Sequence, residues 1–172
     1  GDRNVINIVA LENIPAFVLP DSPTFQANPS FIRPTISNSV RPAVTLGNRS
    51  RLGGFILDAS AGHGVFADTV SNVTIRDILI SNSMGTGILL QNTLDSVTIT
   101  NAAIEGSFGP AFHVDGGNSN IGFVSTSVGV DPSFGRIINS SDAAVLIENT
   151  TGGTVNMTGS TIDDTGGTGI II

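Results

Sequence analysis

Three acidic residues and one histidine stand at places in the chain where they could act together chemically. Asp68, Gln91, Asp115 and Glu148 each end a short apolar segment of similar pattern, and His113 stands two residues before Asp115. If these segments lie side by side as neighbouring strands, the backbones of Asp115 and Glu148 lie about 4.8 Å apart. Two carboxylates that close repel each other, so they must stay solvated, take up a proton or hold a cation.

This pattern is compatible with catalysis, with cation binding, or with solvated surface charges that have no chemical role. A pair of carboxylates at that separation can serve a retaining glycosidase as acid and nucleophile. The same oxygens can bind Ca²⁺, which prefers carboxylate ligands. Solvated acids with no task are the third interpretation. The candidates for binding a ligand or cation are His113, Asp115, Glu148 and Asp68.

The same apolar pattern recurs about every 24 residues. Four segments carry apolar residues at their first, third and eighth positions: VTIRDILI at 73–80, VTITNAAI at 97–104, IGFVSTSV at 121–128 and VNMTGSTI at 155–162. The eighth positions are therefore Ile80, Ile104, Val128 and Ile162. Such a repeat indicates a stacked architecture in which one unit cannot bury its core alone.

A second repeated segment precedes each of these blocks. It reads GHGVFAD at 62–68, GTGILLQ at 85–91, GPAFHVD at 109–115, DAAVLIE at 142–148 and GTGIII at 167–172. Successive copies are 23, 24, 33 and 25 residues apart. The single long interval indicates an insertion near 129–138.

These units alternate between apolar and polar residues, and Gly, Asn, Asp and Ser separate the alternating stretches. This period is typical of short strands, and no segment keeps the apolar spacing of a helix. We therefore predict an all-β solenoid with one unit per coil, parallel strands and equivalent side chains stacked in columns. The three repeated apolar positions then point into the core.

The NVTI block at 72–75 and the GTGI blocks resemble those of right-handed parallel β-helix proteins, in particular extracellular repeat proteins of bacteria. The resemblance covers about residues 43–172 and implies a pectin-lyase-like fold. Leucine-rich repeats have a similar period, but their regular leucine frame is missing here.

The first 41 residues differ from the rest. Residues 4–11 read as a strand, and five prolines then break up the chain. We expect a division into an N-terminal strand with a Pro-rich cap or flap over 1–41 and the coils over 42–172. The opening coils are expected at 34–37, 43–46 and 55–58.

An apolar column is expected on the outer face of the first strand of each coil. Between the inward residues stand Phe66, Leu89, His113, Leu146 and Ile171. Four of these five are apolar, and such a stripe should be covered. The cover is expected to be the N-terminal segment, the insertion or a partner, which makes Phe66, Leu89, Leu146 and Ile171 candidates for partner contact.

Motifs of the polysaccharide-cleaving enzymes that have a β-helix fold fit this chain poorly. The GHG segment around His63 and the pair Asp163–Asp164 resemble elements of polygalacturonases, but their order along the chain is reversed. His63 is therefore interpreted as a turn residue. Pectate lyases use a basic residue with Ca²⁺ held by several aspartates, and neither Arg76 nor Arg136 shares a column with the acidic pair. The chain also has no Trp or Tyr to stack against sugar rings.

Charge and composition limit the possible partners. The net charge is −7 and the pI is about 4.4, which argues against nucleic-acid binding because phosphates need a basic surface. No apolar run is long enough for a membrane span. No signal peptide is visible, and the last segment stops within a repeat, so we expect a piece of a longer protein.

These observations predict a non-catalytic segment of a large secreted or cell-surface β-helix protein that serves as a stalk or an adhesive surface. The acidic, Cys-free composition resembles autotransporter-type passengers. Partners would be the rest of the parent chain, another copy, a glycan or a cell-surface protein, and no cofactor is expected unless Ca²⁺ binds. Two alternatives remain: a polysaccharide lyase or hydrolase with its site at Asp115 and Glu148, and an assembly module that docks through the outer apolar column.

Overall fold

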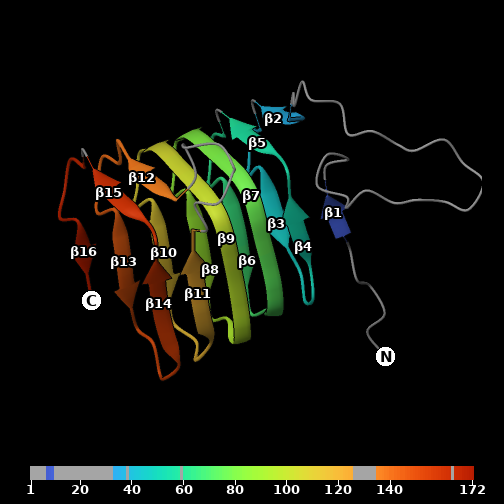
Figure 1. Ribbon diagram of the computed structural model, residues 1–172, viewed down its shortest axis with the longest axis vertical. Coiled ribbons are helices and arrows are strands. Elements are labelled where there is room, and N and C mark those ends of the chain that lie inside the picture. Colours follow the sequence, from blue (N-terminus) through green and yellow to red (C-terminus); the bar gives the residue numbers. More distant parts are fainter. Residues whose placement is uncertain (1–6, 10–32, 38, 59, 126–134, 164) are drawn as a thin grey trace, which may run out of the picture.

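The computed structural model describes residues 7–9, 33–37, 39–58, 60–125, 135–163 and 165–172. Within these ranges all regular structure is β-strand, and neighbouring strands of the sheets are parallel. The coils lie side by side along one axis, with β4 near one end and β16 at the other (Figure 1). The prediction of an all-β parallel solenoid is confirmed.

One wall of the solenoid is a six-stranded sheet with one strand from each successive coil. Its strands, in spatial order, are β3 (Val44–Leu46), β6 (Val65–Asp68), β8 (Ile88–Gln91), β10 (Phe112–Asp115), β13 (Val145–Glu148) and β16 (Ile170–Ile171). Each strand pairs with its equivalent about one repeat away, so a coil supplies the return path that parallel strands require.

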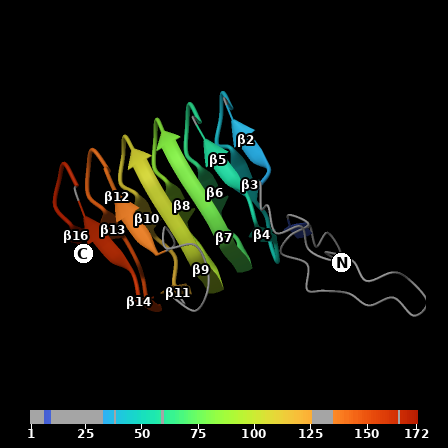
Figure 2. The ribbon, with the colours of Figure 1, turned by 45° about the horizontal axis from the view of Figure 1, so that its top comes forward.

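The rest of the wall is a second sheet that bends around the core. Its first part contains β1 (Asn7–Val9), β4 (Arg51–Gly53), β7 (Ser71–Ser83), β9 (Leu94–Ser107), β11 (Asn120–Val124) and β14 (Thr154–Thr158). Its second part contains β2 (Thr35–Ser37), β5 (Ile56–Asp58), β12 (Arg136–Ile138) and β15 (Thr161–Asp163), together with the ends of β7 and β9. The long strands β7 and β9 cross the middle of the stack (Figure 2).

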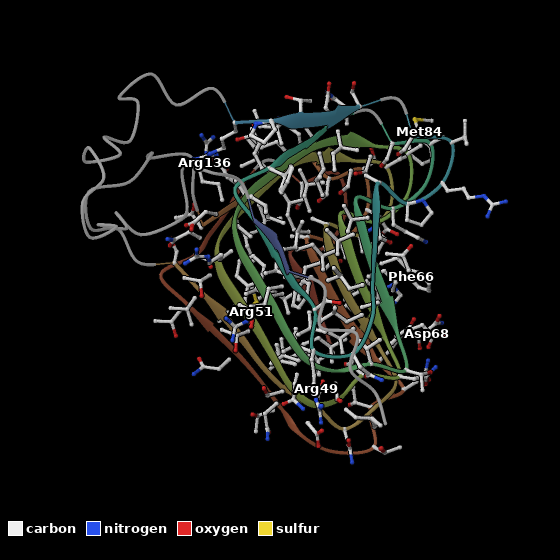
Figure 3. The ribbon with its side chains drawn as sticks, turned by 90° about the vertical axis from the view of Figure 1, so that its right-hand side faces the viewer. Arg49, Arg51, Phe66, Asp68, Met84 and Arg136 are labelled. Carbon is white, nitrogen blue, oxygen red and sulfur yellow. The ribbon has the colours of Figure 1, made fainter. Side chains whose placement is uncertain are left out.

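Equivalent apolar residues stack inside the coils as the repeat predicts. Val73 pairs with Val97, and Ile121 lies between Val97 and Val155. The view down the stack shows the interior filled with side chains (Figure 3). Ile75 and Ile99 are fully buried, and the rings of Phe112 and Phe123 pack with centroids 5.3 Å apart. These columns form one continuous hydrophobic core.

The residue predicted for the eighth position of the third unit is wrong. The column runs through Ile80, Ile104, Ile137 and Ile162, so Ile137 takes the place that was assigned to Val128. Val128 itself lies outside the described residues. Strand pairing holds up to Val124 and resumes at Arg136. In the sequence, the extra residues of the long interval therefore come between β11 and β12, and residues 136–138, which were assigned to the insertion, belong to the coil.

The N-terminal strand joins the bent sheet. Within the strand expected over 4–11, residues 7–9 form β1, which pairs with β4. The segment at 34–37 contributes β2, which pairs with β5. The sheets therefore begin before residue 42, while the Pro-rich residues 10–32 that were expected to form a cap lie outside the described part of the chain.

A left-handed residue follows four strands of the six-stranded sheet, namely β6, β8, β10 and β13. Thr69, Asn92, Gly116 and Asn149 occupy equivalent places with φ of 53°, 49°, 77° and 56°. Asn and Gly tolerate this conformation best, because Gly has no Cβ and Asn can form local hydrogen bonds. The spacing of these residues therefore sets the corner of these four coils.

A serine column at the opposite corner was missed by the sequence analysis. Five residues before the first residue of each strand in the six-stranded sheet stand Ser39, Ser60, Ser83, Ser107, Ser140 and Thr165. Five of these hydroxyls donate to the carbonyl two residues ahead, as Ser107 does to Gly109 at 2.9 Å. The buried hydroxyl of Ser83 has no partner. The constant offset from an apolar segment was a signal visible in the sequence.

The close packing of this corner can be tested with one matched pair of glycines. A Cβ on Gly87 would lie 2.5 Å from both the carbonyl oxygen of Ala111 and Cγ2 of Ile104, whereas Gly169, at the equivalent place in the last coil, has nothing within 4 Å. We expect Gly87→Ala to lower the free energy of unfolding by about 1–3 kcal/mol. Gly169→Ala should be neutral or raise it by about 0.4–1 kcal/mol. Urea denaturation measures both, and equal effects would contradict this packing.

Candidate functional site

The predicted outward columns are brought together on the six-stranded sheet. Strand register places Phe66 beside Leu89, Leu89 beside His113 and His113 beside Leu146, and the next column runs from Asp68 through Gln91 and Asp115 to Glu148. Figure 3 shows Phe66 and Asp68 projecting outward from the same wall, away from the core. The structure thus confirms that Asp115 and Glu148 lie side by side on adjacent coils.

The apolar column is less accessible than the sequence predicts. Leu89 is only 8 % exposed although it points outward, and Ile171 at the last coil is 41 % exposed. Phe66 and Leu146 lie between these extremes. Residues one strand spacing apart cover each other's flanks, so the middle of the column is shielded by its own members. Leu89 therefore offers little surface to a partner, contrary to expectation.

Asp115 is hydrogen-bonded to amides from the coils on both sides. Gln91 donates its Nε2–H to Oδ2 and Asn149 donates its Nδ2–H to Oδ1, each at 2.9 Å. The bonds from Asn149 and then Gln91 hold the pKa of Asp115 below its usual value, and His113 adds a smaller lowering. Both donors favour the charged form. The expected repulsion between adjacent carboxylates therefore does not lead to proton uptake by Asp115.

His113 contacts Glu148 rather than Asp115. Its Nε2 lies 3.1 Å from Oε1 of Glu148, while the side chain of His113 is 15 % exposed and that of Glu148 is 46 % exposed. A pair this open to solvent contributes little net energy, because water competes for both groups. The histidine and the two carboxylates thus do not converge on one point.

Asp68 repeats the arrangement seen at Asp115. Its Oδ1 accepts hydrogen bonds from Thr69 at 2.9 Å and from Nδ2 of Asn92 at 3.3 Å. Asn92 and Asn149 are the left-handed corner residues of the following coils. In both cases a carboxylate at the end of one strand fixes the corner amide of the next coil, which is a structural task.

In the described part of the chain, no cluster of ligands supports the hypothesis of a cation site. Among the described residues, no three His, Asp or Glu side chains gather closely enough to hold a metal ion. Ca²⁺ takes six to eight oxygen ligands, and both oxygens of Asp115 are already hydrogen-bonded. A cavity of about 190 Å³ lies instead at the C-terminal end of the core, beside the inward residues Val114, Ile147 and Val155.

His63 lies in a corner of the solenoid, as its interpretation as a turn residue requires. Its Nδ1 accepts a hydrogen bond from the backbone N–H of Thr86 at 3.1 Å, and its ring stacks on Phe66 with centroids 5.8 Å apart. Asp163 belongs to β15, which pairs with β12 near the other end of the stack, and Asp164 lies outside the described residues. His63 and Asp163 therefore do not form one site.

The role of Asp115 as a link between coils predicts a pH-dependent effect. Asp115→Asn keeps the shape but has one acceptor oxygen for two amide donors, so we expect it to lower the free energy of unfolding at pH 7 by about 1 kcal/mol. Because folding lowers the pKa of Asp115, its contribution is present above the unfolded pKa near 4 and is lost as pH falls through the folded pKa. Urea denaturation at pH 7 and pH 3 measures the difference between variant and wild type.

The matched control is Glu148→Gln, in the same column one coil further on. It keeps a hydrogen-bonding group toward His113, and we expect a smaller loss at pH 7 than for Asp115→Asn. A destabilisation by Asp115→Asn that is as large at pH 3 as at pH 7 would show that the carboxylate is not what links the coils.

Comparison with known proteins agrees with this geometry. A family model described as a right handed beta helix region matches residues 24–172. No curated protein and no solved structure matches the chain significantly. In the described part of the chain, no helix is long and apolar enough to cross a membrane. Together with the parallel coils and their register, the match over most of the chain places this protein in the right-handed β-helix family.

Proposed function

We propose that this β-helix domain is a non-catalytic segment of a large secreted or cell-surface protein, in which it serves as a stalk or an adhesive surface. One observation carries the proposal: the carboxylates in the best candidate site hold neighbouring coils together. Asp115 bonds to amides on both sides, and its pKa is lowered. A general acid for glycoside cleavage needs the opposite, a raised pKa.

The regular stacking supports a scaffold role. Each coil buries its apolar columns against the next, and the corner hydrogen bonds that Asn92 donates to Asp68 and Asn149 donates to Asp115 repeat along the same edge. Stability in such a solenoid is roughly a sum over repeats and their interfaces, so length can grow without a larger core. This property suits a stalk that presents its surface away from a cell.

Exposed apolar residues at one corner support the adhesive role. Met84 and Phe108 directly follow two residues of the serine column and are 62 % and 66 % exposed. The Phe108 N–H donates to the carbonyl of Ser83, so the two corners lie on neighbouring coils. Figure 3 shows Met84 at a corner, away from Asp68. Two large apolar side chains side by side in water favour contact with an apolar partner surface.

The enzyme alternative is tested by a direct assay. We expect no formation of unsaturated product from polyuronates, with or without Ca²⁺, and no release of reducing ends from neutral polysaccharides. Ultraviolet absorbance and a reducing-sugar assay measure the two reactions. Turnover that disappears in both Asp115→Asn and Glu148→Gln would overturn the proposal in favour of a glycan-active enzyme.

The adhesive surface is tested with a double variant at the exposed corner. Beads coated with Met84→Ser/Phe108→Ser should bind cell layers several-fold less than beads coated with the wild type, because the exposed apolar area is lost. Light scattering on the same proteins measures self-association, the alternative use of this corner. Leu94→Ser removes an apolar residue that is 43 % exposed elsewhere on the solenoid and serves as the control. Equal adhesion by all three proteins would contradict a role for this corner.

A further inference from the structure

At the corner with the serine column, three consecutive coils have a closely packed glycine or alanine. The residue before it is Thr86, Pro110 or Ala143 in these coils, and the hydrogen bonding of its backbone amide differs among them. Pro110 has no N–H, and the N–H of Ala143 donates to Oδ1 of Asp142 at 2.8 Å. Thr86 is 5 % exposed, and its N–H donates to Nδ1 of His63 in the coil before. A buried N–H without a partner is destabilising, so this histidine supplies a needed acceptor.

The hydrogen bond requires one protonation state of His63. Only an unprotonated ring nitrogen can accept, so the ring is neutral with its proton on Nε2. The ring is held on one side by its stack on Phe66, and a Cβ added at Gly85 would lie 3.0 Å from Nδ1. The imidazole therefore has little room to turn its other nitrogen toward Thr86.

The surroundings oppose protonation of the ring. Burial, and to a smaller extent the charge of His113 on β10, lower the pKa of His63. Arg41 stands in the corner of the preceding coil, where its backbone is packed near Gly62. The carboxylates on this face are engaged elsewhere, since Glu148 on β13 contacts His113 and Asp68 at the end of β6 is bonded to corner residues. Neither of these carboxylates therefore stabilises the charged form of His63 by direct contact.

We propose that His63 is a proton-sensitive latch between two adjacent coils, closed when neutral and opened by acid. Protonation of Nδ1 turns the acceptor into a donor that faces the N–H of Thr86, so the bond between the two corners breaks. The charged ring then leaves its stack on Phe66 and moves toward water. Opening uncovers Phe66 and loosens this corner while the core columns stay in place.

The sign of the effect follows from the lowered pKa. Because the folded pKa of His63 lies below its unfolded value, the latch contributes its full stability above about pH 6.5 and loses it as pH falls through the folded pKa. The wild-type protein is titrated by NMR, which follows the His63 ring and the amide protection factor of Thr86, corrected for intrinsic exchange, from pH 7.5 to pH 4.5. We expect the protection of Thr86 to fall about tenfold along the His63 titration, as for the loss of one hydrogen bond.

Two variants separate the latch from general acid effects. His63→Gln keeps an acceptor but does not titrate, so protection of Thr86 should be independent of pH in this range. His113→Gln removes the neighbouring charge, so the same opening should occur at higher pH. Protection of Thr86 that stays constant while His63 titrates, or an equal acid response in His63→Gln, would overturn the latch. If His63→Gln does not fold, the wild-type titration and His113→Gln decide the question.

Discussion

Axial stacking of coils is the constraint on which this molecule depends. Each strand finds its hydrogen-bonding partners about one repeat earlier and one repeat later, and equivalent residues face each other in both sheets, with one register shift between Ser71 and Val73. A residue therefore has its own equivalents as its nearest neighbours. An apolar residue is well placed only if the residues one repeat away are also apolar, as in the column of Ile75, Ile99 and Phe123. Polar residues must likewise find donors and acceptors within their own column or the next.

The polar columns show how this requirement shapes the surface. The carboxylates of Asp68 and Asp115 bond to asparagines in left-handed corners of adjacent coils, and most of the serine column closes the opposite corner. These side chains look like candidates for chemistry because they recur at fixed spacing. The same spacing arises when every coil turns at an equivalent corner and needs the same hydrogen bonds there. Regular polar columns on a solenoid are therefore weak signals of catalysis, and departures from the pattern, such as His63 at the Thr86 amide, are more informative.

Several features of the fold could be predicted because they follow from the repeated pattern. The inward columns and the parallel pairing follow from the repeat of about 24 residues. Asp115 and Glu148 could be placed side by side across the long interval because the segments that they end, GPAFHVD and DAAVLIE, share one pattern. Prediction failed where the period changes. Val128 was placed in the core by counting, but Ile137 occupies that column, and Val128 lies outside the described residues. The exposure of Leu89 was also misjudged, because alternation gives the direction of a side chain but not how far its neighbours cover it.

The amino-acid sequence by itself determined the architecture, since a repeat of alternating apolar residues and turn formers admits few folds other than a stack of parallel coils. It also determined which residues share a column. Only the tertiary structure decided what those neighbours do: that Asp115 accepts from Gln91 and Asn149, that His113 turns to Glu148, and that His63 accepts from Thr86. The physical reason is that repeat spacing sets backbone positions to within one strand, whereas hydrogen bonds depend on side-chain directions and distances below 3.5 Å, which packing alone selects.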